Sequence, residues 1–505
     1  MNKGKAGKGR SARRRTKSTL VAPAKTPLPA AGGDGSTKAA GQRLYDMPYS
    51  AAAPKLINPT IGLHHLVARA GHNAAYEIDV TLLDAPDYRL TRSGVLLAHR
   101  VLEGRGEWFL TAPDWYPLLP KDRIETMGDT DLPEEFAELI RPLRRRATLG
   151  PVAALRCERR EFAMRDDAGV TLALLRDDKV TVRRGGLTTA RYREVMMTPV
   201  GPGLTEQQDA WLDRAITQAG ATSVPKFPRL VTRLGAPATG LTDFPAPRPF
   251  EADAPFEMFV SQLLGLRLRQ IVEADLAIRG GNLVAAERLS TQADQLRMEL
   301  KGLSFVLDTD WVEDLYDELD WITLDFDPRS SDPAEAAKAQ EALVGRLHSE
   351  RYLALLDRLV TATRGPKLGD TSILDTSKVL TDLLGSVVTR IRRVVDRLTP
   401  DSPPQVWEEA WRSVGQVQWV ADISTHVMAA ETERIQRRLA KSQQLLDQIH
   451  DLQLQAEEEM EAAAEMTVQQ AFEAGRAYER RLEEVSRIKT AFLALWSKTA
   501  RKLEV

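Results

Sequence analysis

The sequence predicts an α+β protein of several domains, in which an N-terminal antiparallel β-barrel or tunnel precedes a C-terminal all-helical bundle. Three observations predict this order: short β-branched runs between residues 60 and 245, a proline-rich stretch at 236–251, and apolar residues at helical spacing from residue 252 onward. At 505 residues the chain is also longer than one hydrophobic core usually supports. We therefore divide it into a basic tail, a barrel domain, a linker and a helical domain, at 1–58, 59–235, 236–251 and 252–505.

The composition is that of a globular protein and excludes several other classes. Hydrophobic residues make up 43% and charged residues 28%, which excludes a mostly disordered chain. Cys157 is the single cysteine, so an intrachain disulfide and a thiolate-based zinc site are excluded. No apolar run reaches transmembrane length, and no apolar stretch follows the basic N-terminus, so we expect no signal peptide and a cytoplasmic location.

The first segment, residues 1–58, is predicted to be a disordered basic tail. Residues 1–45 contain eleven lysines and arginines against Asp34, whereas the whole chain has a net charge of −2. The densest cations are Arg13, Arg14, Arg15 and Lys17. Such a tail suits contacts to a polyanion, including polyphosphate, nucleic acid or an acidic membrane. The alternative is a solubilising segment with no dedicated partner.

The barrel segment is predicted from strands bounded by Gly, Pro or Asp, with two helices between or after them. Their loose alternation suits a curved antiparallel sheet with a polar interior. We expect strands at Tyr76–Leu83, Val95–Val101, Trp108–Ala112, Val170–Leu175, Val180–Arg183 and Tyr192–Met197, and helices at Leu132–Arg146 and Thr205–Gln218.

The C-terminal segment is predicted to contain six to eight helices, because proline and glycine fall mainly between its apolar-periodic runs. These runs are Phe256–Ile278, Ala285–Leu307, Trp311–Leu324, Ala334–Thr363, Thr376–Leu398, Gln405–Met428 and Glu431–Leu503. The last run is long and mixed in charge, which makes it a candidate surface for self-association.

Several short motifs follow one another in the barrel segment. They include Asp84-Ala85-Pro86-Asp87-Tyr88-Arg89-Leu90, Trp108-Phe109-Leu110-Thr111-Ala112-Pro113, Arg123-Ile124-Glu125 and Asp177-Asp178-Lys179-Val180. Their order and spacing resemble the CYTH family, the triphosphate tunnel enzymes, over about residues 60–235. The resemblance implies a tunnel in which arginines and lysines hold a triphosphate while carboxylates hold divalent metal.

Most of the family's chemical groups are missing here. Asp46 is the one acid between residues 46 and 75, so the family's E-x-E-x-K strand has no counterpart, and Ala98 and Thr111 replace two of its cations. The later acid pair falls on Met196 and Thr198. The remaining anion-binding candidates are Arg100, Arg123, Arg159 and Lys226, and Glu125 and Asp178 remain as metal candidates. We therefore predict a degenerate tunnel with no catalytic residue and no cofactor.

Each remaining residue also has a structural interpretation. Arg123 and Glu125 could form a surface ion pair, and Asp178-Lys179 could form a hairpin turn. Arg159-Arg160 could be solvated strand residues.

The helical segment resembles the CHAD domain, a family that binds inorganic polyphosphate. The resemblance lies mainly in layout, with pieces such as Ile278-Arg279-Gly280-Gly281-Asn282 and Glu350-Arg351-Tyr352-Leu353. The family binds polyanion through two helices patterned H-x-x-R-x-x-x-R-R-L-R. The first pattern falls on Glu287, Ser290, Asp294, Gln295, Leu296 and Arg297, and the second on Glu408, Trp411, Gly415, Gln416, Val417, Gln418 and Trp419. Arg297 alone keeps its charge, so the polyphosphate groove is predicted to be lost.

Two functions follow from these residues. One is a pseudoenzyme, a non-catalytic CYTH–CHAD-like binding or scaffold module associated with polyphosphate, another polyanion or a protein partner. The other is an inorganic triphosphatase or phosphoanhydride hydrolase that depends on Mg²⁺ or Mn²⁺.

Overall fold

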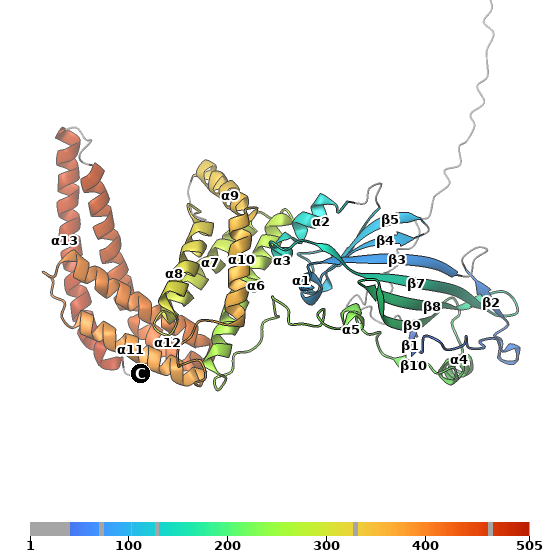
Figure 1. Ribbon diagram of the computed structural model, residues 1–505. Helices are drawn as coiled ribbons and strands as arrows, with labels where there is room; N and C mark the ends of the chain where they lie inside the picture. Colours follow the sequence, from blue (N-terminus) through green and yellow to red (C-terminus); the bar gives the residue numbers. More distant parts are fainter. Residues whose placement is uncertain are drawn as a thin grey trace, which may run out of the picture. The chain divides into compact units, whose positions relative to one another are not determined.

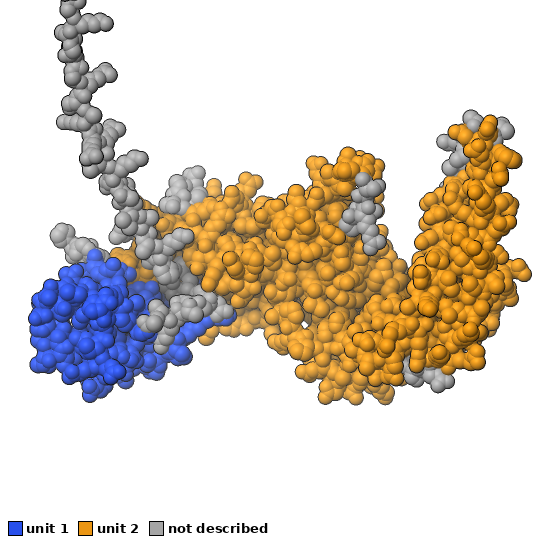
Figure 2. Space-filling view, turned by 180° about the vertical axis from the view of Figure 1, so that it is seen from behind, with its two compact units in different colours: residues 1–69, 160–180, 192–230 blue, residues 70–159, 181–191, 231–505 orange. Residues whose placement is uncertain are grey.

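The computed structural model describes residues 41–69, 75–102, 104–126, 131–326, 332–462 and 468–503. The chain divides into two compact units, which Figure 2 colours separately. The smaller contains residues up to 69, 160–180 and 192–230, and the larger contains 70–159, 181–191 and 231–505. No helix in the described ranges is long and apolar enough to cross a membrane.

The N-terminal strands form one ten-stranded sheet, visible in Figure 1. The strands are β1 (Arg43–Met47), β2 (His65–Ala68), β3 (Ala75–Asp84), β4 (Leu96–Leu102), β5 (Arg105–Thr111), β6 (Asp122–Thr126), β7 (Gly150–Arg165), β8 (Thr171–Arg184), β9 (Leu187–Pro199) and β10 (Thr222–Val224). Their order is β10-β1-β9-β8-β7-β3-β4-β5-β6, with β2 added on β7. The antiparallel sheet is confirmed, but over the described residues its strand order is an open path and not a closed barrel.

Strand β1 corrects the predicted boundary of the basic tail. It lies inside residues 1–58, where we expected disorder, and pairs antiparallel with both β9 and β10. Tyr45 and Met47 are buried and pack with Leu212 and Ile216 of α4 (Glu206–Gln218). The strand was not predicted because it is short and follows a segment rich in Gly, Ala and Lys, a composition typical of disorder. Arg13, Arg14, Arg15 and Lys17 lie outside the described residues.

Helix α4 confirms the helix expected at Thr205–Gln218 and shows why it begins there. The Thr205 hydroxyl accepts from the Gln208 backbone, and the Gln208 side chain accepts from the Thr205 backbone. This reciprocal capping box satisfies two amide donors that the first turn of a helix leaves without partners.

The Asp84-Ala85-Pro86-Asp87 motif has a structural role in this chain. Asp84 is buried and accepts hydrogen bonds from the backbones of Ala85, Leu90 and Thr91 and from the Thr91 hydroxyl. These bonds hold the turn that leads into the short helix α1 (Arg89–Arg92). Burial raises the pKa of Asp84, and these hydrogen bonds oppose that rise.

Two predictions about where elements are interrupted were wrong. The two strands expected at Val170–Leu175 and Val180–Arg183 are one continuous strand, β8 (Thr171–Arg184), so the expected hairpin turn at Asp178-Lys179 is wrong. The helix expected at Leu132–Arg146 is divided into α2 (Glu134–Leu139) and α3 (Arg141–Arg144). Pro142 at the start of α3 lacks the amide hydrogen that would continue α2.

The C-terminal region is helical as predicted. Its helices are α6 (Phe256–Arg279), α7 (Ala285–Leu303), α8 (Thr309–Thr323), α9 (Pro333–Leu347), α10 (Glu350–Arg364), α11 (Thr376–Val395), α12 (Pro404–Ala462) and α13 (Val468–Thr499), preceded by the short α5 (Leu230–Leu234). The single helix expected at Ala334–Thr363 is two, because the Ser349 hydroxyl caps a new start at α10. Helix α12 is interrupted at Met428, where its two parts fold back on each other, so that Trp411 of the first part stacks on His450 of the second with ring centroids 3.8 Å apart. The part after Met428 runs antiparallel to α13 in Figure 1.

Candidate functional site

Arg100 lies on β4 with its side chain buried and paired. Its Nε donates to Glu107 on the neighbouring strand β5 at 3.1 Å, and its Nη2 contacts the same carboxylate. Arg100 and Glu107 are direct cross-strand partners in the β4–β5 register. Glu107 therefore balances the charge that we expected Arg100 to offer to a phosphate chain. The sequence signal was Gly104, which sets the hairpin and hence this register.

Arg123 and Glu125 lie together on β6, as their spacing predicts. Arg123 contacts Glu125 and also Glu135 of α2, and its guanidinium lies 5.3 Å from the Phe136 ring centroid. The bond to Glu135 is the main reason that the pKa of Arg123 is raised. Two carboxylates thus surround one arginine. This agrees with the alternative that Arg123 and Glu125 form an ion pair.

Arg159 and Lys226 lie in different surroundings. Arg159 is fully buried on β7, whereas Lys226 is exposed beyond β10. Each has interaction partners within the chain. The neighbouring Arg160 is exposed, so the alternation of β7 separates the two arginines onto opposite faces.

Asp178 is buried on β8 and lies 3.2 Å from the guanidinium of Arg176. Residues two apart on a strand share a face, which explains this pairing. Among the described residues, no group of three or more His, Cys, Asp or Glu side chains is arranged to hold a metal ion.

In the helical region, Arg297 is also paired. It lies on α7 and contacts Asp294 at 3.0 Å, Asp320 of α8 at 2.8 Å and the Tyr316 hydroxyl at 3.0 Å. Two carboxylates therefore surround the one cation that keeps its place in the helical pattern.

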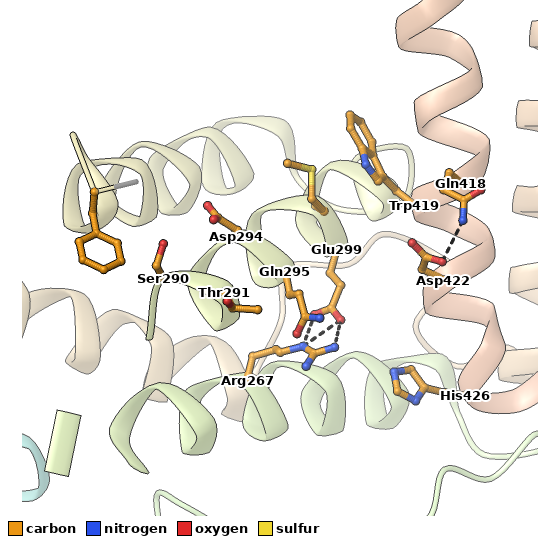
Figure 3. Close-up of a pocket in the computed structure, with 12 residues that line it drawn as sticks. Arg267, Ser290, Thr291, Asp294, Gln295, Glu299, Gln418, Trp419, Asp422 and His426 are labelled. Carbon is orange, nitrogen blue, oxygen red and sulfur yellow. Dashed lines mark hydrogen bonds and ion pairs between the residues drawn. The ribbon is translucent and has the colours of Figure 1, made fainter. Parts of the chain in front are cut away.

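A pocket of about 770 Å³ lies where the two degenerate helix patterns meet, and Figure 3 shows its lining. Helix α7 contributes Ser290, Asp294 and Gln295, while α12 contributes Gln418 and Trp419. Four of these five residues are positions where the helical pattern has lost a cation, and Trp419 directly follows the second pattern. The sequence thus located both walls, but it gave no signal that they enclose a cavity.

Other lining residues were missed by the sequence, because they lie outside the family pattern. Arg267 of α6 bonds to Glu299 of α7 through two nitrogens, at 2.6 and 2.9 Å (Figure 3). Asp422 and His426 come from α12, and Phe326 follows α8. Arg267 is the single lysine or arginine among the described lining residues, and its charge is balanced by Glu299.

The electrostatics of the pocket follow from burial. Burial raises the pKa values of Glu299 and Asp294, and their arginine partners oppose that rise. Asp422 is an exposed residue, and the packing on one side of it raises its pKa against hydrogen bonds from Gln418 and Gln436. The pKa of His426 is lowered by burial and by Arg267, so its imidazole is neutral at pH 7. With three carboxylates and one arginine, the lining carries a formal charge of −2.

No family model and no curated protein matches this sequence. Solved structures that are similar include PptA from Streptomyces chartreusis, with 17% identity, a TM-score of 0.36, and coverage of 48% of this chain and all of that one. A CHAD domain from the plant Ricinus communis has 18% identity and a TM-score of 0.37, covering 51% of this chain and 96% of its own.

A putative adenylyl cyclase from Hippeastrum, described as having a dominant triphosphatase activity, has 14% identity and a TM-score of 0.21. The match covers 39% of this chain and 97% of that one. The neighbours thus include both kinds of protein that the sequence resembles, as predicted. The TM-scores of these three structures are below 0.5, so the function of this chain has to be argued from its own residues.

Proposed function

We propose that this chain is a non-catalytic CYTH–CHAD-like binding or scaffold protein, and that its association with polyphosphate or another polyanion belongs to its basic N-terminal segment. One observation carries the proposal: Arg100, Arg123 and Arg297, three of the predicted anion-binding residues, each contact a carboxylate of the chain itself.

The physical reason is charge balance. A phosphate chain binds where several cations offer uncompensated charge and donors to its oxygens. An arginine that already faces one or two carboxylates attracts a further anion weakly, because the carboxylates repel it at nearly the same distance. Displacing such a carboxylate also requires a buried charge to lose its partner, which is costly.

The triphosphatase alternative needs carboxylates that converge on a divalent cation. The two metal candidates support it poorly. Glu125 lies against Arg123, and Asp178 lies against Arg176. A cytoplasmic location and a protein partner remain predictions of this proposal.

The proposal is tested by the retention of the full chain on immobilised polyphosphate as salt is raised. Deletion of residues 1–40 leaves β1 intact and should abolish retention, as should replacing Arg13, Arg14, Arg15 and Lys17 by Gln. The matched control replaces Arg100 by Gln and should retain the polyphosphate binding of the full chain. Unchanged retention after the deletion, or its loss on Arg100→Gln in a folded variant, would contradict the proposal.

A further inference from the structure

The end of α12 and the start of α13 extend as a pair beyond the helices around them, as Figure 1 shows and Figure 2 shows from behind. We call this pair, residues 452–462 and 468–485, the arm. The first part of α12 begins at Pro404, which lines a groove together with Leu452 of the second part and Val485 of α13. Past this groove the two helices of the arm have mainly each other to pack against, so their outer sides face solvent.

The arm exposes large apolar side chains. Leu454 is 48% exposed, Phe472 68% and Leu482 41%. On α13, Glu479 follows Phe472 by seven residues and precedes Leu482 by three, a spacing that places all three on one side of the helix. Apolar side chains that share an exposed side of a helix are typical of a surface that another molecule covers.

Four charged residues on the same stretch of α13 form no ion pair within the part of the chain that the structure describes. They are Glu473, Arg476, Glu479 and Arg480, and all four are exposed. The Arg480 Nε donates to the backbone carbonyl of Arg476 at 3.2 Å, which leaves both guanidinium charges without a carboxylate. Two positive and two negative charges are thus free to pair with a partner that carries both signs.

The order of these residues is self-complementary about Ala477. When two copies of a helix pack antiparallel about a two-fold axis, residues at equal distances from the axis meet, and each pair occurs twice. An axis beside Ala477 brings an apolar pair and two oppositely charged pairs together, each to within one residue. These pairs are Phe472 with Leu482, Glu473 with Arg480, and Arg476 with Glu479. A parallel copy would instead place each charge beside its own kind, which is unfavourable.

A hollow in the surface lies on the same stretch of α13. It has a volume of about 500 Å³, and its lining is Phe472, Gly475, Arg476, Glu479 and Arg480. A Cβ on Gly475 would meet nothing within 4 Å, so the space above this residue is open. A glycine allows a second backbone to approach closely. The hollow therefore gives a partner helix room at the centre of the self-complementary stretch.

We propose that a second copy of this chain is the partner of the arm, and that the two α13 helices pack antiparallel about a two-fold axis beside Ala477. The contact is short, so the dimer should be weak, with a dissociation constant of roughly micromolar. This inference goes beyond the proposed function, because neither the basic N-terminal segment nor polyphosphate takes part in the contact.

The first test is sedimentation of the full chain, and of the chain lacking residues 1–40, over a range of concentrations. Arg476→Glu and Glu479→Arg, made singly, should each weaken the dimer about tenfold or more, because each places like charges opposite one another twice. The double variant exchanges the two charges and should restore the dimer. Glu341→Arg reverses the charge of an exposed residue on α9 and should leave the dimer unchanged. Circular dichroism and thermal melting verify that each variant is folded.

Cysteine cross-linking tests the antiparallel register. The native Cys157 is buried, so an added thiol is the one that a bifunctional maleimide reaches. Ala477→Cys places the thiols of the two copies level with the axis, and they should cross-link. Thr490→Cys lies on the same side of α13 as Phe472 but 13 residues from the axis, so its two copies would be about 40 Å apart along the helices and should not cross-link.

Three results would overturn this inference: a chain that stays monomeric up to about 100 μM, equal weakening by the arm variants and by Glu341→Arg, or cross-linking of Thr490→Cys as efficient as that of Ala477→Cys. Loss of the dimer on deletion of residues 1–40 would also overturn it, and would assign the association to the basic segment. Retention on polyphosphate is measured separately, so failure here leaves the proposed function untouched.

Discussion

Asp275 of α6 is the most enclosed carboxylate among the helices. It contacts Arg279 at 2.8 Å and accepts a hydrogen bond from the Tyr352 hydroxyl at 3.1 Å. All three side chains are buried or nearly so. Burial raises the pKa of Asp275 to about 6, and Arg279 opposes the rise. Arg100 and Asp178 show the same feature: each is a buried charged side chain that is paired with an opposite charge of the same chain.

Asp275→Asn should change how stability depends on pH. An acid whose pKa is raised on folding binds its proton more tightly in the folded state, so wild-type stability should fall as pH rises from about 4 to about 6. The difference should amount to about 2–3 kcal/mol. Urea unfolding of both proteins between pH 4 and pH 7 measures it. The free energy of unfolding of the asparagine variant should not show this fall with pH. The same change with pH in both proteins would contradict the account.

At the residue scale, the sequence located charged positions but not their partners. Arg123 and Glu125 were correctly expected together, because two residues apart on a strand share a face. Asp178 was interpreted as a turn residue, because the sequence did not show that β8 continues through it. In the structure it is buried within that strand, beside Arg176. Glu299 and Asp422 carried no local signal, since the pocket forms only when α6, α7 and α12 pack.

At the scale of the elements, helix α7 approaches α12 closely at Gly302. A Cβ at Gly302 would lie 2.7 Å from the Ile423 Cδ1 and 3.3 Å from the Trp419 Cβ. The absence of a side chain therefore allows the contact between the two helices that form walls of the pocket. Alanine is otherwise the better helix former, so its effect here reports on packing.

Gly302→Ala should lower the free energy of unfolding by about 1–3 kcal/mol, because overpacking a close helix contact forces the helices apart. Gly385→Ala in α11 is the matched control, since a Cβ there meets nothing within 4 Å. It should raise stability by up to about 1 kcal/mol through helix propensity. Denaturant unfolding of the two variants measures both effects, and equal shifts of the same sign would rule out the close contact as the cause.

Sequence periodicity predicted most elements but not all of their ends. The α6 and α11 helices begin at the expected residues, because their apolar stripes are long and regular. Strand β7 was missed along most of its length, since its arginine-rich pattern does not read as a half-buried strand. Short strands such as β1 and β10 depend on partners far away in the sequence.

At the scale of the whole molecule, the proline-rich stretch 236–251 is more than a spacer. The Asp243 side chain is 1% exposed; it bonds to Arg145 at 2.6 Å, contacts Arg364 and lies 3.8 Å from Arg92. Phe244 beside it packs edge-on against Trp115 at 5.8 Å. Within the larger unit, this segment thus shares a core with the β4–β5 strands and with α6. Composition predicted a linker here, and the domain boundaries at 235 and 252 remain predictions.

Asp243→Asn should destabilise the protein by about 3 kcal/mol or more, because it leaves several arginines around a site without its negative charge. Asp253→Asn, an exposed aspartate nearby, should change stability by less than about 0.5 kcal/mol. Urea unfolding monitored by tryptophan fluorescence distinguishes the two. A stable Asp243→Asn variant would mean that the arginines find water or other partners instead.

The central claim is that Arg100, Arg123 and Asp178 of the sheet are each paired with a charged group of the chain itself and are not free for phosphate chemistry. Its most direct test is the hydrolysis of tripolyphosphate by the full chain with Mg²⁺ or Mn²⁺, measured as released phosphate. The account predicts no turnover above that of the buffer. Turnover that Arg100→Ala abolishes, in a variant that is still folded, would contradict it and restore the triphosphatase.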